Sequence, residues 1–308
     1  MRNALARTLY ELAKEDDRVV VLVADISPAG AMEEFRKEFP DRFINVGVAE
    51  QSMIGLAAGL AQRGFRPFAY TIATFALFRA YEFVRCDLAY QDLPVTVVGM
   101  GAGLSYSTLG GTHQAIEDVA VALACPNLTV LAPCDPTTTS ECVAWCAQRR
   151  TGGPVYLRIG KAGEPDLTST LRGLQRLGAP RRLRATSSPV HVVSYGPIAA
   201  EALKLADAIG ANMSVVTQLS GWAASDPDRA SWGGIGRSGG RIIVVEEASG
   251  APLTVRLAAL GTGATVKGFA LSRSFPHLHG TREELLRAAG LTAEQMLDKL
   301  RAEGRVLH

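Results

Sequence analysis

The chain has 308 residues, a hydrophobic content of 47% and a formal net charge of +2. This length is enough for two domains with sizeable cores, and the nearly balanced charge gives no indication of a nucleic-acid or anionic-membrane surface. No apolar run is long enough to span a bilayer, and the five cysteines contain no Cys-x-x-Cys pair that would predict a zinc site.

The first predicted elements are a helix over residues 2–15 and a strand over 19–23. The helix is amphipathic and differs from a signal peptide, so we expect a cytoplasmic protein. The strand is an unbroken apolar run, typical of a parallel strand covered on both faces. Asp25 and Ser27 follow it. Ligands of open α/β sheets gather beyond the carboxyl ends of strands, so both residues are substrate-binding candidates, with a plain turn as the alternative.

A second strand, over 43–46, turns through Gly47 into a helix predicted over 50–62. Glu50 begins that helix, where negative charge is favoured by the unpaired amide groups and the helix dipole. Glu50 is therefore either a functional carboxylate or only a helix-start signal.

A strand over 67–71 and a helix over 74–90 come next. Phe75, Phe78 and Tyr81 are spaced by three, which predicts that the three rings share one face of a regular helix. Such a stripe is commonly core, but the hydroxyl of Tyr81 also suits the wall of a pocket for a flat heterocycle.

A glycine-rich loop follows the strand predicted over 95–98 and ends at Thr112-His113-Gln114. It differs from the G-x-G-x-x-G fingerprint of dinucleotide-binding proteins. Loops of this kind suit a substrate entrance, so His113 is either a site residue or an ordinary histidine at the start of the helix that follows. Strands over 128–131 and 155–158 come after it. Arg158 and Lys161, near the end of the second of these strands, are either substrate-binding or solvated cations.

Residues 166–189 lack sustained periodicity and predict a linker between domains at 1–165 and 190–308. Helical and strand patterns alternate again in the second domain, without a catalytic constellation. The whole pattern predicts an α/β fold with two open, mostly parallel sheets.

Three motifs taken in order resemble the transketolase family: NVGVAEQ at 45–51, TF-x-x-F-x-x-Y-x-x-x-R at 74–85 and GGTHQAIED at 110–118. The relatives of this family include deoxyxylulose-phosphate synthase and the beta subunits of 2-oxoacid dehydrogenases. The resemblance covers essentially the whole chain. It implies a pyrimidine-binding domain followed by a transketolase C-terminal domain.

The resemblance also implies roles for the candidate residues. Glu50 matches the glutamate that hydrogen-bonds N1' of the aminopyrimidine of thiamine diphosphate, and the cofactor supplies the carbanion chemistry. Phe75, Phe78 and Tyr81 match the aromatic residues that hold the ring. His113 matches a histidine that contacts the reacting part of the substrate and helps to move protons.

Two further positions match family residues that bind the sugar phosphate. A serine near the position of Ser27 helps to hold the phosphate in transketolases, and Lys161 stands about where they have an arginine. Lysine supplies the charge but not the two-pronged geometry of arginine.

The chain departs from the family pattern at two positions. Leu109 stands where typical transketolases have an aspartate that binds a donor hydroxyl, and Gly101 stands about where they have a histidine. A polyol that donates a hydrogen bond to this aspartate would bind less well where the acceptor is missing. We therefore expect a donor or acceptor different from the usual ketose phosphates.

The chain contains no Gly-Asp-Gly motif for the diphosphate site, and it offers no cluster of hard oxygen ligands for a metal. We therefore expect a partner subunit to hold the diphosphate and its Mg²⁺ or Ca²⁺, in an α2β2 heterotetramer. The predicted function is a two-component transketolase, a transferase that moves a two-carbon ketol unit from a ketose to an aldose. The alternatives are a beta subunit of a 2-oxoacid dehydrogenase, another thiamine-dependent carboligase, or a non-catalytic assembly partner.

Overall fold

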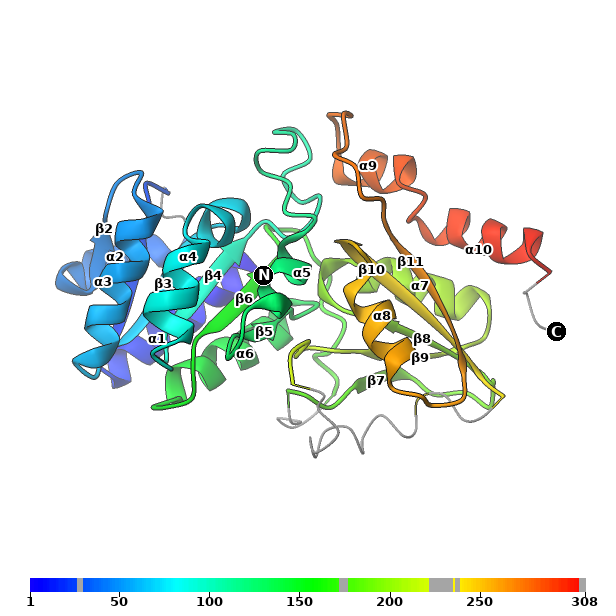
Figure 1. The fold of residues 1–308 in the computed structure, drawn as a ribbon, viewed down its shortest axis with the longest axis horizontal. Helices are drawn as coiled ribbons and strands as arrows, with labels where there is room; N and C mark the ends of the chain where they lie inside the picture. Colours follow the sequence, from blue (N-terminus) through cyan, green and yellow to red (C-terminus); the bar gives the residue numbers. More distant parts are fainter. Residues whose placement is uncertain (27–29, 172–176, 222–234, 236–238, 305–308) are drawn as a thin grey trace.

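The structure is a computed structural model that describes residues 1–26, 30–171, 177–221, 235 and 239–304. Figure 1 shows two α/β units side by side, the N-terminal unit from blue to green and the C-terminal unit from green to red. Each unit is built on one sheet with flanking helices. None of the described helices is long and apolar enough to cross a membrane.

The N-terminal sheet is parallel throughout its described strands, in the order β2-β1-β3-β4-β6-β5. Its strands are β1 (Val19–Val23), β2 (Phe43–Asn45), β3 (Arg66–Ile72), β4 (Thr96–Met100), β5 (Thr129–Leu131) and β6 (Val155–Ile159). Every residue of β1 is buried, as the unbroken apolar run predicts for a strand covered on both faces.

Helices cover both faces of this sheet. The helices α1 (Arg2–Glu15), α2 (Ala31–Glu38) and α6 (Pro136–Gln148) pack on one face, where side chains such as Leu9 and Phe35 form a core with the strands. The other face holds α3 (Glu50–Gln62), η2 (Phe75–Arg79), α4 (Tyr81–Phe83), η3 (Val84–Ala89) and α5 (Asp118–Ala124). A short turn, η1 (Pro40–Arg42), precedes β2.

The segment expected to be one regular helix over 74–90 is wound differently. Residues 75–79 and 84–89 are π-helical, and only three residues between them are α-helical. A π-helix is wider than an α-helix, and single π turns occur frequently at functional sites. The wider turns change the angle between successive side chains, so a spacing of three does not keep the aromatic rings on one face.

The C-terminal sheet has the order β11-β10-β8-β9-β7, in which only β7 runs antiparallel to its neighbour among the described strands. Its elements are β7 (Arg181–Arg184), β8 (Val190–Ser194), η4 (Gly196–Ile198), α7 (Ala199–Ala208), β9 (Asn212–Val215), β10 (Arg241–Ser249), α8 (Pro252–Ala259), β11 (Thr265–Leu271), α9 (Arg282–Ala288) and α10 (Ala293–Ala302). The predicted α/β class with two mostly parallel sheets is therefore confirmed.

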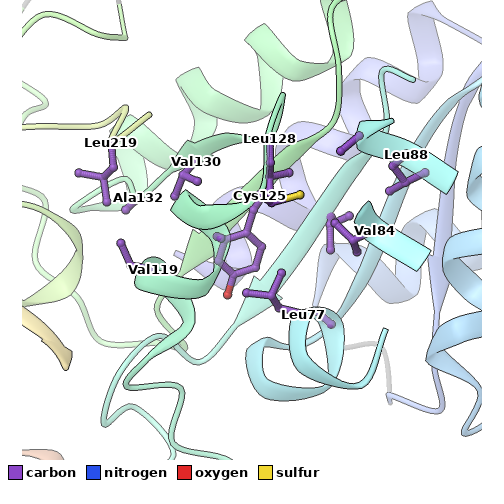
Figure 2. Close-up of a cluster of buried hydrophobic side chains, with 14 of the residues drawn as sticks. Leu77, Val84, Leu88, Val119, Cys125, Leu128, Val130, Ala132 and Leu219 are labelled. Atoms are coloured by element: carbon purple, nitrogen blue, oxygen red, sulfur yellow. The ribbon is translucent and has the colours of Figure 1, made fainter. Parts of the chain in front are cut away.

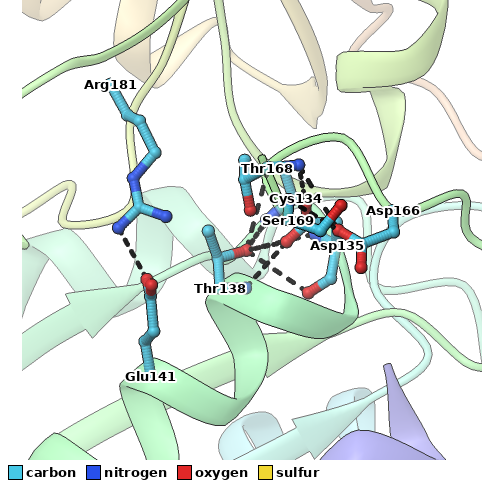
Figure 3. Close-up of polar contacts among 8 residues, drawn as sticks. All are labelled: Cys134, Asp135, Thr138, Glu141, Asp166, Thr168, Ser169 and Arg181. Carbon is cyan, nitrogen blue, oxygen red and sulfur yellow. Dashed lines mark hydrogen bonds and ion pairs between the residues drawn. The ribbon is translucent and has the colours of Figure 1, made fainter. Parts of the chain in front are cut away.

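Part of the segment expected to be a linker belongs to the second sheet, because Arg181–Arg184 forms the edge strand β7. Figure 3 shows how the segment is attached to α6. Buried Asp135 caps α6 and also accepts a hydrogen bond from the backbone amide of Thr168, and Arg181 pairs with Glu141 at 2.6 Å. Asp135 accepts a further hydrogen bond from the backbone amide of Leu167. These contacts link distant parts of the chain, so local periodicity does not predict them.

The two units share a hydrophobic core. In Figure 2, Leu219 of the second unit lies close to Val119, Val130 and Ala132 of the first, and all four belong to one buried cluster. The junction is therefore packed rather than bridged by a flexible connection, and side chains of the second unit can reach the loops of the first.

Candidate functional site

The candidate residues gather at one edge of the N-terminal sheet. Because its strands are parallel, their carboxyl ends meet at the same edge, which is where ligands of open α/β sheets bind. The segments that leave β1, β2, β3, β4 and β6 there contain, in order, Asp25, Glu50, Phe75, His113 and Lys161.

The turn before Glu50 is shaped by the side chain of Asn45 at the end of β2. Its Oδ1 accepts hydrogen bonds from the amides of Gly47 at 3.0 Å and Asp25 at 3.1 Å, which ties the ends of β1 and β2 together. Gly47 has φ +71°, a conformation that glycine adopts without steric cost. The chain then enters α3 with Glu50 as its first residue, only 2% exposed.

The carboxylate of Glu50 is paired with the guanidinium of Arg79, the last residue of η2. Nη1 of Arg79 lies 2.9 Å from both Oε1 and Oε2. The same guanidinium stacks on the ring of Phe75, with its carbon 4.4 Å from the ring centroid. Arg79 is 40% exposed, so it reaches the buried carboxylate from the solvent side. A flat, nitrogen-bearing cation thus already lies between Glu50 and an aromatic face.

The three aromatic residues lie in different surroundings. The ring of Phe75 faces the site and meets the imidazole of His113 edge-on, with 5.2 Å between centroids. Phe78 and Tyr81 pack against the hydrophobic core, and the hydroxyl of Tyr81 donates to the backbone oxygen of Val121 at 3.2 Å. The Tyr81 hydroxyl therefore has the hydrogen-bond partner that a tyrosine needs when it is buried, and this partner is a backbone oxygen of the protein.

His113 is held between two aromatic rings. Besides Phe75, the ring of Tyr106 lies 5.7 Å from the imidazole centroid. Thr112 contacts Nδ1 of His113 at 2.8 Å, and the Thr74 hydroxyl donates to the backbone oxygen of Thr112 at 2.9 Å. Burial lowers the pKa of His113 because it disfavours the charged imidazole. Burial therefore favours the neutral imidazole, which can accept a proton.

Tyr106 forms the wall next to His113. Its ring packs over Gly101, which has φ +89°, and a Cβ at that position would overlap the ring. The Gly101 departure noted in the sequence therefore makes room for Tyr106. Nζ of the exposed Lys161 lies 4.7 Å from the centroid of the Tyr106 ring, a cation–π contact that places the cation at the same wall.

Arg158 does not join this group. Its side chain is 1% exposed, and its Nε donates to Asp118 at 2.8 Å. Its Nη2 donates to the backbone oxygens of Ala115 at 3.2 Å and Glu247 at 3.0 Å. With these contacts Arg158 ties β6, the start of α5 and β10 together. We therefore leave it out of the substrate-contacting set that we propose below.

The other two candidates follow β1. Asp25 is exposed at the edge of the sheet with φ +47°, a left-handed conformation that aspartate adopts more readily than most residues. Ser27 lies outside the described residues, so its place in the site stays a prediction.

Sequence reasoning missed three residues. Arg79 and Tyr106 stand inside the quoted motifs or loop, but only tertiary contacts reveal what they touch. Gln114 is fully buried, and neither atom of its amide has a hydrogen-bond partner among the described residues. Buried polar groups are normally satisfied, so Gln114 next to His113 is a place where a water molecule or a ligand group is expected.

This arrangement suits proton transfer to and from a bound organic molecule. It combines a buried carboxylate, a neutral imidazole and an exposed cation around aromatic walls. The described residues contain no group of three or more His, Cys, Asp or Glu side chains that could hold a metal ion.

The sequence of the first unit is similar to known proteins. Residues 1–163 match the family described as "Transketolase, pyrimidine binding domain". The chain is 44% identical over 159 residues to a putative transketolase C-terminal section of Methanocaldococcus jannaschii, covering 52% of this chain and 50% of that protein. It is 36% identical over 166 residues to a subunit of apulose-4-phosphate transketolase of Phocaeicola vulgatus, covering 54% and 53%. The chain thus spans about half the length of the curated relatives it matches.

The fold of both units is similar to a solved split gene transketolase in an inactive beta4 tetramer. The TM-score is 0.81 at 31% sequence identity, and the match covers 98% of this chain and 97% of that one. The similarity therefore extends over the C-terminal unit as well as over the region that the family description covers.

Proposed function

We propose, because this chain belongs to the transketolase family, that it is one subunit of a thiamine-diphosphate-dependent transketolase. In the proposed reaction the enzyme transfers a two-carbon ketol unit from a ketose donor to an aldose acceptor. This chain contributes the pyrimidine-binding and C-terminal units. The relatives named as a C-terminal section, as one subunit of a transketolase and as a split gene enzyme support this division.

The observation on which the proposal rests is the position of Glu50. It is a buried carboxylate at the edge of the sheet where ligands bind, and it lies in the motif NVGVAEQ. We propose that it hydrogen-bonds the ring nitrogen of the aminopyrimidine and exchanges a proton there. When bound, thiamine diphosphate supplies the carbanion chemistry that the side chains of a protein cannot.

The residues around Glu50 fit a flat aminopyrimidine. The guanidinium of Arg79 is planar, carries N–H groups and already lies against both the Phe75 ring and the Glu50 carboxylate. An aminopyrimidine ring would require the same two things: a flat space against an aromatic ring and a hydrogen-bond acceptor at its edge. We propose that Phe75 contacts the pyrimidine, and that Phe78 and Tyr81, packed against the core, support the segment that presents it.

We further propose that His113 takes and returns a proton at the reacting end of the sugar, since burial favours its neutral form. Lys161, placed by the Tyr106 ring, would bind an anionic end of the substrate. Asp25 and Ser27 would contact a sugar or its phosphate beyond β1. The diphosphate and its Mg²⁺ or Ca²⁺ would be held by an N-terminal partner subunit in an α2β2 assembly.

Calorimetry tests the proposal directly. Thiamine diphosphate with Mg²⁺ is titrated into this chain alone, into the candidate diphosphate-binding subunit alone, and into the mixture. Tight binding in the mixture only is the expected result. Tight binding to this chain alone would contradict the division of the site between two subunits.

The role of Glu50 is tested in the same mixture with Glu50→Gln. This change keeps the side-chain size, and it should lower turnover by about 10²-fold or more. Its matched control is Glu82→Gln, an exposed acid on the neighbouring α4, which should leave turnover unchanged. Turnover by Glu50→Gln close to that of the unaltered chain would refute the assignment.

The products of the mixture separate the alternatives. A transketolase forms a new ketose without gas release, whereas a 2-oxoacid dehydrogenase or a decarboxylating carboligase releases carbon dioxide from a 2-oxoacid. Complex formation without cofactor binding would indicate an assembly partner that is not catalytic.

A further inference from the structure

The loop that ends at His113 is held from the side by the C-terminal unit. This loop, residues 101–113 between β4 and α5, contacts β10 through Glu247 and contacts the segment 272–280 before α9. Figure 1 shows the loop standing next to the orange segment that leads to α9. The residues of the C-terminal unit that make these contacts have no place in the reaction chemistry proposed above.

The first contact is made by the buried side chain of Glu247. Its Oε1 accepts a hydrogen bond from the amide of Leu104 at 2.7 Å, and its Oε2 pairs with Arg282, the first residue of α9. Gly103 has φ +57°, and a Cβ there would lie 2.7 Å from the Glu247 carboxyl. The side chain of Leu104 is fully buried in the hydrophobic core of the C-terminal unit. The base of the loop is thus anchored in that unit.

The second contact is made at the tip of the loop. The imidazole Nδ1 of His279 lies 3.3 Å from the backbone oxygen of Thr108. A Cβ at Gly110, which has φ +74°, would lie 2.8 Å from the His279 ring, and one at Gly111 would lie 3.3 Å from Phe275. A Cβ at Gly103 or Gly110 would therefore overlap a side chain of the C-terminal unit, and a Cβ at Gly111 would lie in tight contact with one.

A loop rich in glycine has many backbone conformations when it is free, so external contacts must select the one that places its functional side chain. Small displacements of a catalytic group can cost about a hundredfold in rate. His113 is two residues beyond the contact at Gly111. Contacts that restrain the loop at both its base and its tip therefore restrain His113.

We propose that the C-terminal unit positions the His113 loop, with Glu247 as the main positioning residue and His279 as the second. Glu247 acts through the Leu104 amide and through Arg282, which connects the loop to α9. Its effect on turnover of the sugar rests on the function proposed above, but its effect on the conformation of the loop does not.

Hydrogen exchange in the chain itself tests the positioning. Glu247→Ala removes an acceptor from the Leu104 amide, and amides 104–113 should exchange about tenfold faster or more. The matched control is Glu246→Ala. Glu246 is also buried, but it bonds within its own unit, to Leu253, Thr254 and Tyr195, and its removal should leave the loop unchanged.

A second test variant keeps the proposal testable if Glu247→Ala does not fold. His279→Ala changes an exposed side chain and should also accelerate exchange at residues 107–113, whereas His277→Ala, exposed on the same segment, should not. Exchange at β8 serves as an internal reference. Unchanged loop exchange in both test variants, or equal acceleration in both controls, would overturn the proposal.

Steady-state kinetics of the mixture with the partner subunit provide the functional readout. Glu247→Ala should lower kcat for the sugar about tenfold or more, because it displaces the proton-transferring His113, while the calorimetric affinity for thiamine diphosphate stays unchanged. Faster exchange with an unchanged kcat would overturn the positioning role. Absence of turnover in the unaltered mixture would count against the proposed function instead, because the exchange comparison is made on this chain alone.

Discussion

Asp118→Asn should destabilise the protein strongly, because it leaves the charge of Arg158 buried without a partner. Asp118 is 0% exposed, and its Oδ2 accepts hydrogen bonds from Arg158 Nε and from the Tyr156 hydroxyl, both at 2.8 Å. Burial alone would lower the pKa of the Arg158 guanidinium, but the charge of Asp118 and its hydrogen bond, together with the nearby Tyr195 and Tyr156, outweigh burial and the pKa rises. Arginine keeps its charge in proteins even when it is buried, so the guanidinium stays charged when asparagine replaces Asp118.

Removal of one partner from a buried ion pair costs about 3–5 kcal/mol. For a chain of 308 residues that loss corresponds to a fall in Tm of roughly 5–8 °C. The control is Asp207→Asn, which breaks the exposed pair with Arg184 and should cost about 0–1 kcal/mol. The double variant Asp118→Asn with Arg158→Met removes both charges and should recover part of the loss.

Urea unfolding of the three variants measures these free energies, and differential scanning calorimetry measures the Tm. A loss for Asp118→Asn no larger than that of Asp207→Asn would refute the structural role of the pair. An unchanged stability together with weaker sugar binding would restore Arg158 as a substrate ligand, as its place near the carboxyl end of β6 suggests.

Three further predictions concern single residues. Arg79→Met should raise the affinity of the assembled enzyme for thiamine diphosphate about two- to fivefold, because no guanidinium has to leave Phe75. Weaker calorimetric binding would show that Arg79 itself holds the cofactor. Leu109→Asp should shift donor preference toward ordinary ketose phosphates. Unchanged donor kinetics would show that residue 109 does not contact the hydroxyl groups of the donor. The pKa of His191 is lowered to about 4, mainly by burial and further by Arg182. The unfolded chain binds more protons than the folded one between about pH 6.5 and pH 4, so stability is complete above this range and falls as the pH drops through it. Urea unfolding across that pH range should show a smaller loss of stability for His191→Gln than for the unaltered chain.

The order and class of the secondary structure are determined locally. Val19–Val23 predicts a strand buried on both faces, and all five residues are buried. Glu50 is predicted in a first helical turn, and it is the first residue of α3. These predictions are correct because hydrophobic periodicity, turn residues and helix-start preferences act over a few neighbouring residues.

Local patterns do not predict which distant residues a side chain contacts. Arg158 has the same local sequence signature as a surface cation, yet Asp118 and two backbone oxygens enclose it. The aromatic spacing at 75–81 assumed an α-helix, and the segment adopts wider turns. The edge strand β7 forms in a segment without periodicity because β9 offers it an edge to pair with.

Local patterns are therefore sufficient to predict the α/β class, the family motifs and the carboxylate around which the site is built. Three contacts of the site follow from the folded chain alone: Arg79 pairs with Glu50, Tyr106 fills the space above Gly101, and Glu247 holds the loop before His113. These contacts join residues that are distant in the chain or that are placed by the path of a glycine-rich loop. Their energies depend on burial and geometry, which no local pattern encodes.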